Sequence, residues 1–524
     1  MHKYSLYVNI RRLSQLTFLI LFFYLAIETT INIDLFYSSP QLDKNIKYFL
    51  AFDPLVALIV IITTGTISAV FIYSFFLFVL TIIFGRFFCG FICPFGTLHH
   101  FFSYIGSKFI IKPKYINYKY SKWQNLKYYI LFSLIILAIF KINLIGIFDP
   151  LTFLLRSSVS FIIPFIQSAI NYFGKLLILL GMSDFGRYLE SDIAFAVFGK
   201  ENIFFGQTFL IGIILITLFI IDLFVYRFYC RFICPLGAFL AIISSKSLLN
   251  IKQKEGCIAC YKCDRSCFAS SNPSSSDNFK KSECMLLGNC LKECPVNVMG
   301  FDFLSTRKSS VDVNKRYLLS TACLTIISTS LFRYSFNRER INPKLIRPPG
   351  ALAELDFLAR CLRCSACIKV CPQNFLQPSL IEGRLEALWT PIGSGRLGYC
   401  EYNCKLCSEV CPTGAIKQIT LEEKKKISIG TAFIDKNRCL PYAFDTECAV
   451  CEEMCPVSPK AIYFKEEQIV TRDNTEKIIK RPVVDPDKCT GCAICEFKCP
   501  IVDKPAIYIT SIGEDRSKYN QFLF

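Results

Sequence analysis

Residues 361–372 read CLRCSACIKVCP, and this stretch decides what kind of domain the last part of the chain forms. Two residues separate each of the first three cysteines, and the fourth follows after three more and precedes a proline. Cysteines at this turn spacing wrap one corner of an iron–sulfur cubane, and in two-cluster ferredoxins the last one ligates the neighbouring cluster. The stretch therefore predicts a cluster-binding, ferredoxin-like fold.

Four motifs of this kind lie between residues 345 and 524. Their cysteines are Cys361, Cys364, Cys367 and Cys371; Cys400, Cys404, Cys407 and Cys411; Cys439, Cys448, Cys451 and Cys455; and Cys489, Cys492, Cys495 and Cys499. Zinc is the alternative metal, but zinc sites generally pair two separate C-x2-4-C elements across a longer gap. The motifs predict four [4Fe–4S] clusters in a small α+β domain. We expect the first motif to pair with the fourth and the second with the third, with adjacent pairing as the alternative.

Residues 250–305 form a second, smaller cysteine-rich domain with two expected sites. By the same cross-ligation rule, one complete [4Fe–4S] site takes Cys257, Cys260, Cys263 and Cys294. The other site takes Cys267, Cys284 and Cys290, and Leu287 stands where its fourth cysteine is expected. Three thiolates suit a [3Fe–4S] cluster or a [4Fe–4S] cluster with another fourth ligand. An empty, decayed site is the remaining alternative.

The rest of the chain is unusually apolar, with 53% hydrophobic and 19% charged residues. Apolar stretches at 13–33, 66–84, 128–147, 204–226 and 317–332 predict an α-helical membrane domain with about five transmembrane helices. The net charge of +18 does not point to nucleic acid, because the lysines gather in short loops beside apolar stretches, as the positive-inside rule requires. The chain has three histidines and lacks C-x-x-C-H, so no haem is expected, and no flavin is expected because no flavin attachment sequence occurs.

Lysine asymmetry also predicts the orientation in a bacterial inner membrane. The loop at 103–127 carries lysines and no acid, which places it in the cytoplasm. With a membrane domain at 1–245 and a fifth span or signal-like anchor at 316–336, the N-terminus and residues 230–315 are expected in the cytoplasm. Residues 345–524 are then expected in the periplasm. The less apolar segment 157–181 is expected to lie at the interface rather than to cross the bilayer.

A direct repeat runs through the membrane domain. FDPL occurs at 52–55 and 148–151, and RFFCGFICPFG at 86–96 is echoed by RFYCRFICPLG at 227–237. Cysteines four residues apart share one helix face, so the repeat could bring four thiols together around a metal or a cluster. These thiols are Cys89, Cys93, Cys230 and Cys234. Buried structural thiols, or thiols with redox roles of their own, are the alternative.

Three further residues in the apolar part of the chain also need an interpretation. Asp53 and Asp149 occupy equivalent places in the FDPL motifs, expected at the outer membrane edge. We expect them to cap helices before proline, and a proton acceptor for a quinol is the alternative. Cys323, alone in the fifth apolar stretch, is expected to be a small packing residue.

The motifs IRPPGALAELDFLARCLRCSACIKVCP, CPTGAI, CAVCEEMCP and CTGCAICEFKCP resemble the ferredoxin-type proteins NapG and MauM, over residues 345–510. Residues 1–305 resemble NapH, a four-span membrane polyferredoxin with paired C-x3-C-P motifs and a cytoplasmic cluster domain. These pairs are shared with NosR, whose flavin attachment sequence this chain lacks, and with the oxidase assembly factor CcoG. NapG-like proteins are exported folded by a twin-arginine signal, and NKRYLL at 314–319 resembles a lysine–arginine variant of it.

The resemblance implies an electron conduit from the quinol pool or a cytoplasmic donor to a periplasmic reductase or cytochrome, as in periplasmic nitrate respiration or a related anaerobic respiration. The alternative is a CcoG-like accessory factor that reduces a metal during maturation of a respiratory metalloenzyme. The chain has no molybdopterin, flavin or haem signature. An electron-transfer, quinol dehydrogenase-like component is therefore expected, rather than a substrate-converting catalytic subunit.

Overall fold

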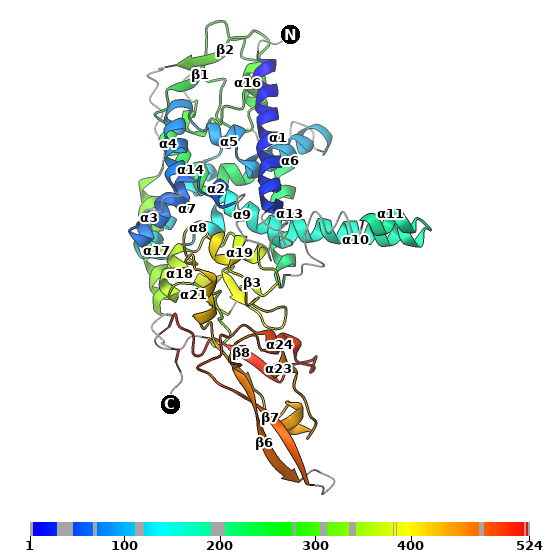
Figure 1. Cartoon of the computed structure of the whole chain (residues 1–524). Coiled ribbons are helices and arrows are strands. Elements are labelled where there is room, and N and C mark those ends of the chain that lie inside the picture. Colours follow the sequence, from blue (N-terminus) through cyan, green and yellow to red (C-terminus); the bar gives the residue numbers. More distant parts are fainter. Residues whose placement is uncertain are drawn as a thin grey trace. The chain divides into compact units, whose positions relative to one another are not determined.

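The computed structural model describes residues 4–28, 46–66, 71–110, 120–189, 205–275, 279–303, 311, 313–334, 342–380, 382–383, 385–470, 476–517 and 520–521 (Figure 1). The chain divides into two compact units. The first draws on residues 1–28, 44–162 and 208–331, and the second on residues 29–43, 163–207 and 332–524. The predicted division into four domains stays a prediction.

The first unit is built mainly from helices. Its α-helices are α1 (Ser5–Glu28), α2 (Lys47–Leu50), α3 (Pro54–Thr64), α4 (Ile72–Phe84), α5 (Phe87–Phe91), α6 (Pro94–Ile105), α7 (Leu126–Ile139), α8 (Ile145–Phe148), α9 (Pro150–Ser157), α13 (Thr208–Asp222), α14 (Pro235–Ser244), α15 (Lys262–Arg265), α16 (Asn289–Lys292) and α17 (Lys315–Tyr334). Short π- and 3-10-helical segments are η3 (Gly106–Ile110), η4 (Lys122–Asn125), η5 (Ser158–Ile162), η7 (Tyr229–Ile233) and η8 (Lys281–Glu283). Strands β1 (Leu249–Gln253) and β2 (Met299–Phe303) pair antiparallel and enclose the small cysteine-rich domain.

The FDPL motifs start helices α3 and α9. In each, the aspartate side chain accepts hydrogen bonds from the backbone amides two and three residues further on, at 2.8 and 3.1 Å for Asp53 and at 3.1 and 2.8 Å for Asp149. Proline is the first helical residue, where its fixed φ suits the helix and its missing N–H costs nothing. The helix-cap interpretation of Asp53 and Asp149 is confirmed.

Among the residues that the structure describes, two helical stretches are long and apolar enough to cross a membrane, Ser5–Glu28 and Pro150–Leu179. The first overlaps the first predicted span, and the second overlaps the segment predicted to lie at the interface. The stretches 66–84 and 204–226 yield the shorter helices α4, with 13 residues, and α13, with 15. A helix that crosses the bilayer alone needs about 20 residues. The prediction of about five transmembrane helices is therefore not confirmed.

Helix α17 covers the fifth predicted span. Thr325 on its inner face donates a hydrogen bond to Ser133 of α7 at 3.1 Å. Cys323, in contrast, is exposed on this helix. Its interpretation as a packing residue was wrong, because it lies on the opposite side from the α7 contact.

The second unit combines short helices with two-stranded sheets. Its helical segments are α10 (Ile163–Leu179), α11 (Ser183–Arg187), α18 (Glu354–Arg360), α19 (Ala366–Lys369), η9 (Leu385–Ala387), α20 (Leu406–Glu409), α21 (Leu421–Lys426), α22 (Leu440–Ala443), α23 (Val450–Glu453) and α24 (Ile494–Lys498). Antiparallel strand pairs are β3 (Leu376–Pro378) with β4 (Pro391–Gly393), β5 (Thr431–Ile434) with β8 (Ile507–Thr510), and β6 (Ile462–Val470) with β7 (Glu476–Val484). The last pair is the long hairpin of Figure 1.

A largely buried carboxylate joins the start of the ferredoxin-like segment to its end. Glu354 pairs with Arg347 at 2.6 Å and with Arg516 at 2.7 Å. Burial alone would raise the pKa of Glu354, but the two guanidinium groups lower it to about 2. Arg347, from the RPPG motif, also packs over the Phe357 ring at 4.7 Å from its centroid. These contacts hold the loop before the first cysteine motif in place.

Candidate metal centres

The cysteines of residues 257–294 and 361–499 gather into six sets, each combining two neighbouring motifs. Site A is Cys257, Cys260, Cys263 and Cys294; site B is Cys267, Cys284 and Cys290; site C is Cys361, Cys364, Cys367 and Cys411; site D is Cys400, Cys404, Cys407 and Cys371; site E is Cys439, Cys448, Cys451 and Cys499; and site F is Cys489, Cys492, Cys495 and Cys455. In every set, the last cysteine of one motif joins the first three of its partner, or the first two in site B.

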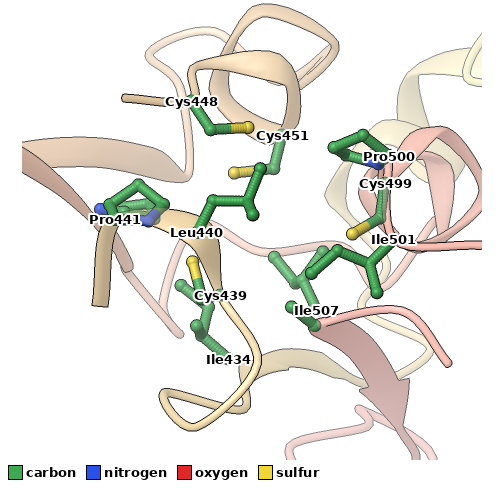
Figure 2. Close-up of a pocket in the computed structure, with 12 residues that line it drawn as sticks. Ile434, Cys439, Leu440, Pro441, Cys448, Cys451, Cys499, Pro500, Ile501 and Ile507 are labelled. Carbon is green, nitrogen blue, oxygen red and sulfur yellow. The ribbon is translucent and has the colours of Figure 1, made fainter. Parts of the chain in front are cut away.

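Sites A, B, C and E each surround a cavity. Figure 2 shows site E, where Cys448, Cys451 and Cys499 stand around the same space as Cys439. In site D, Cys371 lies close enough to Cys400, Cys404 and Cys407 to interact electrostatically with each. Cys455 stands in the same relation to the cysteines of site F.

The pairing expected for the last four motifs is wrong. The first motif exchanges its last cysteine with the second, forming sites C and D, and the third exchanges with the fourth, forming sites E and F. The adjacent alternative therefore describes the fold. The antiparallel pairing of β5 with β8 explains it for sites E and F, because these strands bring residues 431–434 and 507–510, which flank the third and fourth motifs, side by side.

The spacing within the sites also bears on the choice between zinc and a cluster. Among the described residues, no three His, Cys, Asp or Glu side chains lie close enough together to hold a single metal ion. A cubane needs its four thiolates on the corners of a larger body, so cysteines around a cavity fit the cluster better than a zinc ion.

A backbone signature runs through the closely spaced motifs. The residues directly before and after the second cysteine have a left-handed conformation, as do Arg363 (φ 55°) and Ser365 (φ 64°) in site C. L-amino acids rarely adopt this conformation, and such strain persists where the surroundings impose it. The left-handed conformation turns the backbone amides toward the sulfur atoms. Cys361 and Cys364 each accept a hydrogen bond from the amide two residues further along the chain. The same alternation occurs in the first motif of site A and in site F.

Site B keeps this signature without its fourth cysteine. Leu286 (φ 52°) and Gly288 (φ 72°) hold the two left-handed positions on either side of Leu287. The Leu287 side chain is buried and lines the cavity with the three cysteines of the site. From outside, Tyr7 of α1 donates a 2.7 Å hydrogen bond to the Leu286 carbonyl. The loop thus keeps a cluster-binding conformation although one ligand is missing.

The four cysteines of the C-x3-C-P motifs come together, and we call this group the repeat site. Cys93 caps α6 and Cys234 caps α14, and their sulfur atoms accept the amides of Gly96 at 3.3 Å and Gly237 at 3.2 Å. Thiolates are favoured at the positive end of a helix dipole. All four cysteines are buried, and each lies within electrostatic range of the other three.

Two arginines cross over between the repeats. Arg227 of the second repeat donates to the carbonyls of Cys89 at 2.9 Å and Gly96 at 2.8 Å in the first. Arg86 of the first repeat lies against Gly237 of the second repeat. A Cβ added to Gly237 would be 2.9 Å from the terminal nitrogen of Arg86. At Gly96 the corresponding distance to Arg227 is 2.5 Å. The glycines therefore leave room for two buried cations beside the four cysteines.

The FDPL motifs lie nearer to the repeat site than predicted. Tyr229, beside Cys230, donates a hydrogen bond to the Phe148 carbonyl of the second FDPL motif. The expected placement of the aspartates and the cysteine pairs at opposite membrane faces stays a prediction. The carboxyl groups of Asp53 and Asp149 are both fully buried and lie close enough to interact electrostatically.

Sequence reasoning missed the residue that joins the small domain to the repeats. Glu283, next to Cys284, is buried and accepts hydrogen bonds from Arg86 at 3.2 Å, from Tyr128 at 2.8 Å and from Lys127. Burial alone would raise the pKa of Glu283, but Lys127 and Arg86 hold it below its ordinary value. The sequence contains one indication of this role, because Glu283 is an acidic residue directly before a candidate ligand cysteine. The residues that pair with Glu283 are far away in the sequence, so the sequence does not reveal them.

Comparison with known proteins agrees with this arrangement. The model of a 4Fe-4S binding domain matches residues 66–113 and 207–254, which contain the two C-x3-C-P repeats. The methylamine utilization ferredoxin-type protein MauM of Methylorubrum extorquens is 36% identical over 119 residues, 22% of this chain and 51% of that protein. The ferredoxin-type protein NapG of Escherichia coli is 33% identical over 99 residues, 18% and 42% of the two chains.

A third relative is the putative electron transport protein YccM of Escherichia coli, 24% identical over 227 residues, 42% of this chain and 51% of that protein. The chain spans about half the length of these curated relatives. No solved structure matches. The resemblance of residues 1–305 to NapH stays a prediction. The similarities show that the chain contains a ferredoxin-type segment and 4Fe-4S binding domains.

Proposed function

We propose that this protein is a membrane-bound iron–sulfur electron carrier, in which sites A, C, D, E and F each bind a [4Fe–4S] cluster. The observation that carries the proposal is the exchange of last cysteines between neighbouring motifs, which completes five sets of four thiols. Each set supplies four sulfur ligands, and backbone amides that donate to the sulfur atoms add hydrogen bonds in sites C and F. A cluster bound there would accept and release one electron at a time.

A [3Fe–4S] cluster is our proposal for site B. The retained left-handed residues around Leu287 support a loop still shaped for a cluster, which argues against a decayed site. The buried leucine occupies the position of the absent ligand, so three thiolates remain. For the repeat site we propose a further cluster, supported by the two helix N-termini and by Arg86 and Arg227 around the four thiols.

A membrane location is supported by the surface of the helices in the first unit. On α1, Arg11 and Gln15 are buried, whereas Leu13, Leu16 and Ile20 are more than half exposed. Helix α4 likewise buries polar side chains, those of Ser74 and Thr81. Exposed apolar faces of this extent are typical of a surface that meets lipid or a partner. We propose that these faces meet the hydrocarbon of a bacterial inner membrane.

The sites in the second unit form a series. C and D share exchanged cysteines, as do E and F, and the amide of Cys400 in site D donates a 2.8 Å hydrogen bond to the carbonyl of Cys492 in site F. The order C–D–F–E follows from these contacts. In the first unit, site B adjoins the repeat site, because Arg227 reaches Met285 at 3.1 Å. Electrons would pass between neighbours in each series.

For the wider pathway, we propose that electrons come from the quinol pool or a cytoplasmic donor and reach a reductase or cytochrome in the periplasm. The similarity to NapG and MauM supports a redox partner and leaves its identity open to a periplasmic nitrate reductase-type enzyme or a related one.

Two measurements on the full chain test the proposal. Membranes washed with alkaline carbonate should retain the protein, and the anaerobically purified chain should lose its visible iron–sulfur absorbance on reduction and regain it on oxidation by one-electron steps. Release of the protein by carbonate contradicts the membrane location. A chain that contains zinc, or whose absorbance does not respond to a reductant, contradicts electron transfer.

A further inference from the structure

One buried lysine stands at the junction between the two cluster pairs of the second unit. Lys424 lies on α21, in a run of three lysines that reads as a solvated face, yet its side chain is buried while Lys426 is exposed. A capping box formed by Thr420 and Glu423 fixes the start of this short helix. The position of Lys424 is therefore set by the fold and not by a flexible surface segment.

The ammonium group of Lys424 faces site D. It donates hydrogen bonds to the carbonyls of Glu401 and Tyr402, the latter at 3.2 Å, and it interacts electrostatically with the Cys400 thiol. It also interacts electrostatically with Cys404 and Cys407. One cavity is lined by Lys424, by Cys400 of site D and by Cys492 of site F.

The two cluster pairs differ in the charges around them. Besides Lys424 at site D, the buried Arg363 lies beside Cys361 of site C. No cation is among the main electrostatic influences on Cys439, Cys451, Cys489, Cys492 or Cys495 of sites E and F. Asp485 lies near Cys489 of site F. A buried positive charge stabilises the reduced, more negative state of a cluster, and hydrogen bonds to sulfur act in the same direction.

We propose that Lys424 raises the reduction potential of site D and thereby makes it the electron-holding site at the junction. This inference rests on the proposed function. In the step that it controls, site F gives up one electron and is oxidised, and site D takes up that electron and is reduced, with no proton or other reactant required. Lys424 itself takes up no electron. It acts through its positive charge, and the electron moves between the two clusters.

The test is potentiometric titration of the full anaerobic chain, followed by electron paramagnetic resonance. Lys424→Met keeps the length of the side chain and removes its charge, so one cluster should become at least ten times harder to reduce, about 59 mV for a one-electron couple. The other potentials should stay unchanged. Lys424→Arg should restore most of the shift, and Lys426→Met on the same helix should have no effect.

The outcomes separate this inference from the function on which it rests. Unchanged potentials in Lys424→Met, with iron content as in the wild type, would show that Lys424 only tethers the loop carbonyls. Loss of one cluster's iron in that variant would show that Lys424 holds the cluster rather than tunes it, and would also overturn the proposal. Absence of iron from the wild-type chain would instead remove the proposed function itself.

Discussion

Glu283→Gln tests how the small cysteine-rich domain is attached to the repeats. The substitution keeps the size of the side chain and removes the charge that faces Arg86 and Lys127, both fully buried. Removing one partner of a buried ion pair costs about 3–5 kcal/mol, because the other charge stays buried without compensation. We expect about 3 kcal/mol, the lower end of that range, since the amide oxygen can still accept the hydrogen bond from Tyr128.

A loss of this size lowers the ratio of folded to unfolded protein more than about 100-fold. The assay is denaturant unfolding in detergent micelles, followed by circular dichroism, with Glu293→Gln as the matched control. Glu293 is exposed in the same domain, so its variant should stay within about 0.5 kcal/mol of the wild type. In a double-mutant cycle, Lys127→Met should cost less in the Glu283→Gln background than in the wild type. Equal stability of Glu283→Gln and Glu293→Gln would refute the reasoning.

Three further predictions concern other parts of the chain. The oxidised wild type should give the resonance signal of a spin-half three-iron cluster, and Leu287→Cys should convert it to a four-iron type at lower potential; a gain of four irons without a prior signal would mean an empty native site. Since the pKa of Glu354 is lowered to about 2, its stabilisation is complete above its ordinary pKa of 4.5 and is lost as the pH falls from there toward 2. Glu354→Gln should flatten the dependence of the unfolding free energy on pH in that window by roughly 3 kcal/mol, and an unchanged slope would count against the Arg347–Glu354–Arg516 contact. A reporter fused after residue 524 should be active in the periplasm, and activity confined to the cytoplasm would reverse the proposed orientation.

The cysteine sets of sites A and B followed from spacing alone, because the small domain contains only two motifs and exchange between them has one solution. The last four motifs offered several solutions, and spacing does not encode which one the chain adopts. Strand pairing between β5 and β8 decides it for sites E and F, and short strands of this kind leave little periodicity in a sequence.

The residues that tune the sites were harder to predict. Lys424 looks like any lysine of a charged run, and only the packing of α21 against the Tyr402 loop buries it. Arg86 and Arg227 were visible as repeated residues, but their exchange between repeats depends on the close approach of the two motifs at Gly96 and Gly237. Membrane spans were predicted from apolar runs. Breaks within these runs, such as the one at Lys141 (φ 62°) between α7 and α8, left most of the helices below spanning length.

The most direct test of the central claim is the amount of iron and acid-labile sulfide in the anaerobically purified full chain, with Mössbauer spectroscopy to identify the cluster types. Five [4Fe–4S] clusters and one [3Fe–4S] cluster amount to about 23 irons per chain, and any cluster at the repeat site would add to this number. We predict at least this value, with nearly equal sulfide. A value of about 16 or fewer would remove the clusters of the small domain, and zinc in place of iron would contradict the account as a whole.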